Sequence, residues 1–332
     1  MRKHASQFRI PLLLVALILA ITLLAAPIAV EAQTSRIPRI GVLSPGSLGP
    51  SRPLDAFREG LRGHGYVEGQ SIIIEYRFDD ARPERLPDLA AELVRLKVDI
   101  IVTVNTPASQ AARNATKTIP IVFTFVADPS SLVASLGRPG GNITGLTTLG
   151  AELSPKRLEL MKEALPGLSR VAYLWATGNP MVPQFFKEMK QAGPRLGIEL
   201  QSLGVQKADD LPHALKAAAA KHAGALFVWE DALLQPHRVR ILELAATHRL
   251  PTASQYREFA EAGGLLSYGP NLTEHFHRAA LYVDRILKGA KPGDLPVEQP
   301  SKYELVVNTK TARTLNLTIP QSLLGRADQV LN

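Results

Sequence analysis

The sequence of 332 residues contains no cysteine. Disulfide bonds, thiolate chemistry and a lipid anchor on cysteine are therefore excluded. A chain of this length can form a core that is large enough to be stable without disulfides, so the absence is compatible with export from the cytoplasm.

Aromatic residues are also scarce, at 6% of the chain. The formal net charge is +8, but the basic residues are scattered along the sequence. Nucleic-acid binding requires basic residues gathered in a stripe or patch, with aromatic side chains interleaved. We therefore interpret the positive charge as a solvated surface and expect no nucleic-acid partner.

Motifs for catalysis are missing as well. The sequence has no G-x-S-x-G elbow, no H-E-x-x-H and no phosphate-binding loop. His275 and His277 are two residues apart, so they do not share a helix face, and we expect neither a metal nor another cofactor. A Ser/His/Asp triad brought together by the fold stays open, although no local motif supports one. Four further histidines lie in polar helical segments and are expected to be exposed: His213, His222, His237 and His248.

The N-terminus has the pattern of a targeting segment. Three basic residues within the first nine positions precede an apolar stretch over 10–30. Val30 and Ala32 occupy the two small-residue positions of a signal-peptidase site. We interpret residues 1–32 as a secretory signal that is cleaved after Ala32. The stretch is also long enough to span a bilayer, so an uncleaved anchor is the alternative.

From residue 37 onward, short apolar strands alternate with amphipathic helices. This rhythm is typical of a parallel sheet that helices cover on both faces. Residues 137–148, "GRPGGNITGLTT", interrupt the alternation before a second one follows. Strands are expected at 39–46, 70–80, 99–106 and 119–129, and then at 170–180, 198–205, 224–231 and 250–256. Helices are expected at 51–66, 83–98 and 107–116, and then at 154–166, 181–197, 209–223 and 237–249.

The predicted fold class is α/β, with two Rossmann-like three-layer lobes built on parallel sheets. A helix at 272–288 and a tail that returns after Leu295 indicate that the chain crosses between the lobes more than once, giving a multi-strand hinge beside a cleft. The expected division follows from this pattern. Lobe 1 takes 33–145 plus about 272–300, and lobe 2 takes 146–271 plus about 301–332.

The segment "IVTVNTPASQAA", residues 101–112, predicts a buried strand that leads into a helix. Asn105 or Thr106 is the expected N-cap, and Pro107 lies near the first helical position. The first N–H groups of such a helix are unpaired and carry partial positive charge, so this turn is a candidate for binding a ligand.

Ligands of open parallel sheets bind at the carboxyl ends of the strands. Hydroxyl groups and helix N–H groups there suit a carboxylate, acidic side chains suit an ammonium group, and aromatic rings stack on an apolar body or a cation. Together they predict a small zwitterionic or amphiphilic solute. The candidates in the first lobe are Ser44, Asn105, Thr106 and Asp128, and those in the second lobe are Asn179, Trp229, Glu230, Asp231 and Tyr256.

Structural roles are the alternative for the same residues. Asn105 and Thr106 also suit plain helix caps, and Asp128 suits a turn before Pro129. Trp229 follows an apolar run, so it also suits the core. Glu230 and Asp231 also suit a solvated loop.

Three segments resemble a known family. They are "IGVLSPGS" at 40–47, "IPIVFTFVADPSSLVASLGRPGGNITGLT" at 119–147, and 262–330 from "AGGLLSYGPN" to "LLGRADQV". They resemble ABC-transporter substrate-binding proteins with the type I periplasmic-binding-protein fold, a group that includes binding proteins for aromatic amino acids. The resemblance covers the chain after the signal.

The resemblance implies three crossovers between the lobes, capture of a solute by domain closure, and delivery to an inner-membrane ABC permease. By position, Ser44, Asn105, Thr106, Asp128 and Asp231 match the family's cleft loops. The "WED" at 229–231 departs from a short apolar–Asp pattern at that loop. A soluble, monomeric periplasmic protein without a catalytic step is implied, with an amino acid as one candidate solute. A ligand-sensing subunit of a receptor, and less favourably a secreted hydrolase, are the alternatives.

Overall fold

The computed structural model describes residues 36–332, except 47–48, 50, 81, 149, 151–152, 180, 232 and 301. The predicted signal over 1–32 and its cleavage after Ala32 lie outside the described residues. None of the helices in the described part of the chain is long and apolar enough to cross a membrane.

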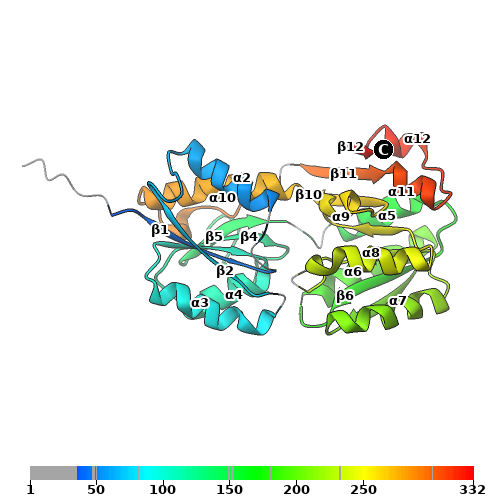
Figure 1. Ribbon diagram of the computed structural model, residues 1–332, viewed down its shortest axis with the longest axis horizontal. Coiled ribbons are helices and arrows are strands. Elements are labelled where there is room, and N and C mark those ends of the chain that lie inside the picture. Colours follow the sequence, from blue (N-terminus) through cyan, green and yellow to red (C-terminus); the bar gives the residue numbers. More distant parts are fainter. Residues whose placement is uncertain are drawn as a thin grey trace, which may run out of the picture. The chain divides into compact units, whose positions relative to one another are not determined.

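The first sheet has five strands in the order β2-β1-β3-β4-β5, and all of them are parallel. The strands are β1 (Arg39–Ser44), β2 (Ile73–Phe78), β3 (Ile100–Val104), β4 (Ile121–Val126) and β5 (Ile143–Thr147). The helices packed against this sheet are α2 (Arg52–Gly63), α3 (Leu86–Arg95), α4 (Thr106–Ala115) and α10 (Leu272–Leu287). Figure 1 shows α2 and α10 together, and α3 beside α4.

The second sheet has seven strands in the order β12-β11-β10-β9-β8-β6-β7. They are β6 (Arg170–Ala176), β7 (Glu199–Val205), β8 (Ala225–Val228), β9 (Thr252–Ser254), β10 (Leu266–Pro270), β11 (Tyr303–Asn308) and β12 (Gln329–Leu331). Its helices are α5 (Ser154–Ala164), α6 (Val182–Leu196), α7 (Leu211–Ala220), α8 (Arg238–Thr247), α9 (Arg257–Glu261), α11 (Thr309–Thr314) and α12 (Gln321–Leu324). β10 and β11 are antiparallel, so this sheet departs from the predicted all-parallel arrangement.

Alternation along the strands gives each sheet two apolar faces. Ile40 and Val42 of β1 are buried with α2 and α10, whereas Leu43 is buried with α3 and α4 on the opposite face. In β6, Tyr173 belongs to the cluster with α5 and α6, and Leu174 to the cluster with α7 and α8. Successive strand residues point to opposite faces, so a strand with helices on both sides must be apolar throughout. The predicted α/β fold of two lobes is confirmed.

The chain passes between the two sheets three times. The first passage leads from β5 to α5, and the second leads from β10 to α10, which packs on the first sheet. After α10, Glu298 still pairs with Leu146 beside β5, and the third passage then leads to β11. The two lobes are therefore joined by several chain segments, as predicted.

The segment over 137–148 does not merely interrupt the alternation, as the sequence indicates, because 143–147 form the fifth strand of the first sheet. Its composition, rich in Gly, Thr and Asn, hides the strand. The dipeptide Ser154-Pro155 is typical of an N-cap followed by the first helical residue. Ser154 is instead the first helical residue of α5, and its hydroxyl donates to the carbonyl of Gly150.

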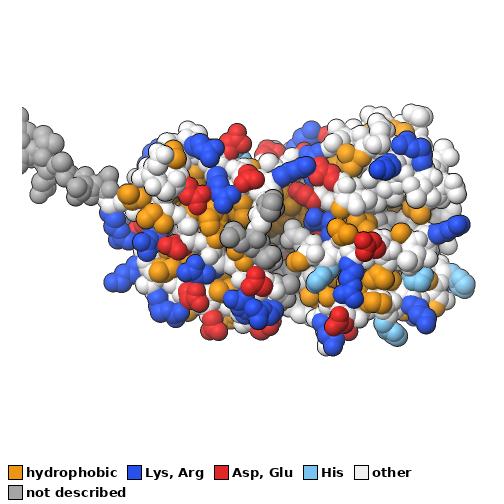
Figure 2. Space-filling view, in the orientation of Figure 1, with side chains coloured by type: hydrophobic (Ala, Val, Ile, Leu, Met, Phe, Trp, Pro, Cys, Tyr) orange, Lys and Arg blue, Asp and Glu red, His pale blue; other side chains and the backbone are white. Residues whose placement is uncertain are grey.

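Charged side chains are interspersed over the face shown in Figure 2, where Lys and Arg alternate with Asp and Glu. No basic stripe is visible on that face. This distribution agrees with a solvated surface.

Replacement of Gly145 by alanine is expected to lower the free energy of unfolding by about 2 kcal/mol or more. Gly145 has φ +149°, and a Cβ atom there would lie 2.0 Å from the carbonyl oxygen of Phe123 and 2.6 Å from its nitrogen. Gly141→Ala is the control, because nothing lies within 4 Å of its Cβ position. Urea denaturation followed by circular dichroism measures both variants, and equal midpoints would show that β5 tolerates the added carbon.

Candidate ligand-binding site

A cavity of about 420 Å³ is lined by residues that follow strands of both sheets. In a parallel sheet, the residues after each strand meet at one edge, where ligands bind. The first sheet contributes Pro45, Pro83, Glu84, Val104, Asn105, Thr106, Pro107, Phe125 and Ala127. The second contributes Ala176, Gly178, Asn179, Gln206, Lys207, Ala208, Trp229, Glu230, Asp231 and Tyr256, with further lining from Met181, Phe185, Leu233, Gln235 and His237.

The cavity brings together seven of the nine candidates from the sequence: Asn105, Thr106, Asn179, Trp229, Glu230, Asp231 and Tyr256. Ser44 instead lines a neighbouring cavity of about 370 Å³, and its hydroxyl donates to the carbonyl of Pro45 at 3.3 Å. Pro45, Val104, Phe125 and Gln235 line both cavities. Asp128 lines neither, and its Oδ1 accepts the N–H of Ser130 at 2.8 Å in a local turn.

Asn105 is the N-cap of α4, which decides between the two predicted caps. Its Oδ1 accepts the N–H of Ala108 at 3.0 Å. Its backbone has φ +75° and ψ 169°, a conformation that is costly for any residue with a side chain. Three further hydrogen bonds hold it: its N–H donates to Thr124, and the N–H and the hydroxyl of Ser109 both donate to its carbonyl. This turn places Thr106, at the first position of α4, on the cavity wall.

Phe125 is a cavity residue that the sequence does not reveal. Its position within an apolar strand indicates a core residue, but the register between β4 and β5 shifts between Phe123 and Val126, and Phe125 has φ +64°. Such a bulge turns a side chain away from the regular alternation. The Phe125 ring lies 5.0 Å from the ring of Tyr256, which follows β9 of the second sheet.

His237 is a second cavity residue that differs from expectation. The sequence predicts an exposed side chain, yet His237 is partly buried and lines the cavity. His237 lies at the cavity because it belongs to a short 3-10 turn, Gln235–His237, that precedes α8. Local polarity cannot show which end of a helix faces the partner lobe.

Trp229 is both a core residue and a residue of the cavity wall, the two roles that the sequence suggests for it. It is only 4% exposed and belongs to the core cluster of the second sheet, while it also lines the cavity. The ring of Phe185 packs against it at a centroid distance of 4.6 Å. The guanidinium carbon of Arg157 lies 5.6 Å from the Trp229 ring centroid.

Glu230 is 4% exposed, so the solvated-loop interpretation is wrong for this residue. Its Oε1 accepts a hydrogen bond from Nε of Arg238 at 2.7 Å, and its Oε2 accepts the Ser254 hydroxyl at 3.1 Å. Burial raises the pKa of Glu230 to about 7, against the opposing effect of Arg238. Both carboxylate oxygens have partners within the protein, so Glu230 holds the loop in place.

Asp231 is the second acidic residue of this loop and is partly buried. Its Oδ1 accepts the N–H groups of Leu233 at 3.0 Å and Leu234 at 3.2 Å. Burial raises the pKa of Asp231 to about 6, although these bonds and one from the side chain of Asn179 lower it. An ionised Asp231 in the cavity wall is suited to a cationic group.

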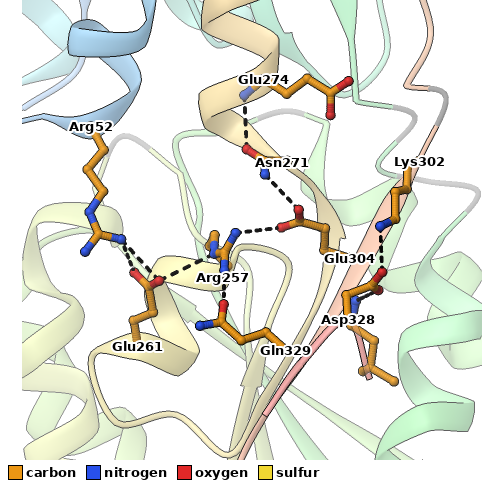
Figure 3. A network of polar contacts seen from close by, with 10 residues as sticks. Arg52, Arg257, Glu261, Asn271, Glu274, Lys302, Glu304, Asp328 and Gln329 are labelled. Atoms are coloured by element: carbon orange, nitrogen blue, oxygen red, sulfur yellow. Dashed lines mark hydrogen bonds and ion pairs between the residues drawn. The ribbon is translucent and has the colours of Figure 1, made fainter. Parts of the chain in front are cut away.

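A network of polar contacts joins elements of both lobes beside the second passage of the chain (Figure 3). Arg52 of α2 donates from Nη1 to both oxygens of Glu261 of α9, at 3.0 and 3.2 Å. Glu261 also pairs with Arg257, whose Nη1 lies 3.2 Å from Glu304 of β11. Asn271, the N-cap of α10, donates to the same Glu304 at 2.7 Å.

A sequence model of one protein family, described as ABC transporter substrate binding protein, matches residues 49–331. The chain belongs to this family. The fold is the two-lobe type I periplasmic-binding-protein fold of its structural neighbours, as the resemblance in the sequence implied. Members of this family bind small molecules and work with ABC transporters.

Several known proteins are similar to the chain. A tyrosine-binding protein from Clostridioides difficile is 26% identical over 264 residues, which are 79% of this chain and 75% of that protein. The crystal structure of a conserved domain protein from Vibrio cholerae has 30% identity and a TM-score of 0.82, covering 89% of this chain and 100% of that one. The structure of an ABC domain in complex with L-Trp, from Streptococcus pneumonia, has 24% identity and a TM-score of 0.81 with the same coverage.

Loss of the Arg52–Glu261 ion pair is expected to let the lobes of this substrate-binding protein separate further on average. Exposed ion pairs contribute about 0–1 kcal/mol, so the effect of Arg52→Ala should be seen at about 10 mM salt and vanish near 1 M salt. The radius of gyration from small-angle X-ray scattering is the measurement, and we expect an increase in the variant at low salt.

Arg170→Ala is the matched control, because its ion pair with Glu199, at 2.8 Å, lies within one lobe. Glu261→Ala combined with Arg52→Ala should change the radius no more than either substitution alone. A radius equal to that of the parent protein at low salt would contradict a role for the pair between the lobes.

Proposed function

We propose that this protein is the periplasmic solute-binding component of an ABC importer, and that it captures a small amphiphilic solute without a catalytic step. The observation that carries the proposal is the cavity of about 420 Å³, whose walls come from the carboxyl ends of strands in both lobes. A site divided in this way exposes its solute when the lobes separate and encloses it when they close. The closed state then offers a permease a surface that the open state lacks.

The cavity wall suits a zwitterion with an apolar body. Asp231 offers a carboxylate to an ammonium group, and Thr106 offers a hydroxyl to a carboxylate at the start of α4, where the helix dipole is positive. The rings of Trp229, Tyr256 and Phe125 provide aromatic walls for the remainder of the solute. Asn105, Asn179 and Glu230 hold the loops that carry these groups.

An amino acid with an aromatic side chain is the first candidate solute. The cavity chemistry supports it, and so do the two relatives described as tyrosine-binding and as a complex with L-Trp.

We further propose residues 33–145 with about 272–300 as lobe 1, and 146–271 with about 301–332 as lobe 2. Ser44 would then contact a solute only where the neighbouring cavity joins this one, and Asp128 would not contact it.

A thermal-shift panel of amino acids, amines, small carboxylates and aromatic compounds tests the proposal on the chain from Gln33 onward. A solute that binds only the folded protein stabilises it by about 2.7 kcal/mol at a hundredfold excess over Kd. We expect L-tyrosine or L-tryptophan to raise the melting temperature and to be recovered unchanged. A compound that is consumed would indicate an enzyme instead, and a panel without any zwitterion that binds would overturn the solute class.

The affinity for such a zwitterion is expected to depend on pH through Asp231. Its pKa of about 6 in the ligand-free protein means that the carboxylate is mostly ionised above pH 7 and mostly protonated below pH 5. An ammonium group binds the ionised form, so affinity should fall as pH drops through 6, by up to about tenfold per unit.

Asp231→Asn should weaken binding at pH 8 by about tenfold or more, because a hydrogen bond to a charged group is worth about 1.5–3 kcal/mol. It should also remove the part of the pH dependence that is centred on pH 6, while any part that follows Glu230, whose pKa is about 7, should remain. Asp209→Asn is the control, since the Asp209 side chain is 80% exposed. Calorimetric titration measures both, and an unchanged pH profile in Asp231→Asn would show that the ammonium group lies elsewhere.

A further inference from the structure

Arg157 of α5 is a buried cation that the cavity wall itself does not include. It is 1% exposed, and taking a charge out of water costs several kcal/mol unless strong partners compensate. Burial lowers the pKa of Arg157 to about 10, so the guanidinium stays charged at neutral pH. The partners that the structure gives it among the described residues are two backbone carbonyls and an aromatic ring, with no carboxylate.

One carbonyl lies in the first passage between the lobes, and the other lies in β10, the strand that leads into the second passage. Nη1 of Arg157 donates to Gly150, which lies between β5 and α5, at 2.9 Å. Nε donates to Tyr268 of β10 at 2.9 Å, two residues before β10 ends and the chain leaves for α10. One side chain therefore ties the first passage to the strand that leads into the second.

The aromatic partner is Trp229, whose ring lies 5.6 Å from the guanidinium carbon and forms part of the cavity wall. The first passage also limits the position of this ring. A Cβ atom on Gly150 would lie 2.9 Å from Cη2 of Trp229 and 2.9 Å from the side chain of Ala127, which follows β4 in the other lobe. Trp229 is thus held between the first passage, the ring of Phe185 and Arg157.

We propose that Arg157 is a positioning residue of the solute site: it fixes the Trp229 ring in the cavity wall and anchors that ring to the first passage between the lobes and to β10, the strand that leads into the second. It does not touch the solute. A planar guanidinium holds its donors in a rigid fork and can stack on a ring, whereas an ammonium group is a compact charge with freely rotating donors. The part of the proposal that concerns solute affinity rests on the proposed function, and the part that concerns Trp229 does not.

The fluorescence of Trp229 can be measured by itself once one residue is replaced, because the chain contains two tryptophans. Trp175, on β6, donates to the hydroxyl of Ser202, so Trp175→Phe leaves Trp229 as the single reporter. Arg157→Met and Arg157→Lys are made in that background. Lys156→Met is the control, since Lys156 is the neighbouring residue of the same helix, is 44% exposed, and pairs with Glu159.

In the ligand-free protein, we expect Arg157→Met to change the emission maximum of Trp229 and to raise its acrylamide quenching constant about twofold, because the ring loses its fixed position. Arg157→Lys should fall between the parent and Arg157→Met, and Lys156→Met should equal the parent. Calorimetric titration with L-tyrosine should show about tenfold weaker affinity in Arg157→Met, which corresponds to about 1.4 kcal/mol.

Far-UV circular dichroism shows whether each variant is folded, and if Arg157→Met is not, Arg157→Lys is judged by the same readouts. Emission and quenching of Trp229 equal to those of the parent in a folded variant would overturn the proposal. If the parent does not bind L-tyrosine while the Trp229 readouts change, the positioning role stands and the proposed solute class fails. If Trp229 changes but affinity stays within twofold, the claim that Arg157 shapes the solute site is refuted.

Discussion

All strands of the first sheet run in one direction, and so do most strands of the second, which puts the end of each strand at a common edge. Residues that follow β1, β3 and β4 meet there in one lobe, and residues that follow β6, β8 and β9 meet in the other. The cavity exists because these two edges meet. Side chains from loops far apart in the sequence, such as Thr106 and Asp231, thereby line one site. The rest of the site depends on this geometry, since no single segment of the chain supplies more than a few of its groups.

The backbone around the cavity is strained at two points. Asn105 and Phe125 both have positive φ although neither is glycine, and such conformations cost about 1–3 kcal/mol each. At Asn105, the cap to Ala108 and the hydrogen bonds with Thr124 and Ser109 offset that cost. At Phe125, ring contacts with Tyr256 and with Phe276 of α10 hold the bulged residue between the lobes. Strain at both positions turns groups toward the cavity that a regular strand and helix would direct elsewhere.

Two buried charged groups near the cavity are compensated in different ways. Glu230 and Arg238 form an ion pair completed by Ser254, and this pair sets the shape of the loop that carries Trp229 and Asp231. Arg157 is compensated instead by the carbonyls of Gly150, in the first passage between the lobes, and Tyr268, in β10. Each arrangement uses an expensive buried charge to fix the position of a neighbouring residue, and in both cases that neighbour lines the cavity. The charged groups that shape the site therefore differ from Asp231, the acidic group proposed to meet the solute.

The sequence alone determined the fold class, because apolar strands and amphipathic helices alternate with local periodicity that needs no distant contacts. It also located the strand ends, and hence Asn105, Thr106, Asn179, Trp229, Asp231 and Tyr256 at the cavity.

The sequence did not reveal β5, where Gly145 permits a close approach to Phe123 that only strand pairing explains. Nor did it reveal that Phe125 and His237 line the cavity wall, or that the Glu230 carboxylate accepts a hydrogen bond from Arg238. Ser44 and Asp128 follow strands just as the other candidates do, yet neither lines this cavity. These outcomes depend on a register shift, on which helix end faces the partner lobe, and on pairs of side chains distant in sequence. They are set by tertiary contacts, which leave no periodic signal in the chain.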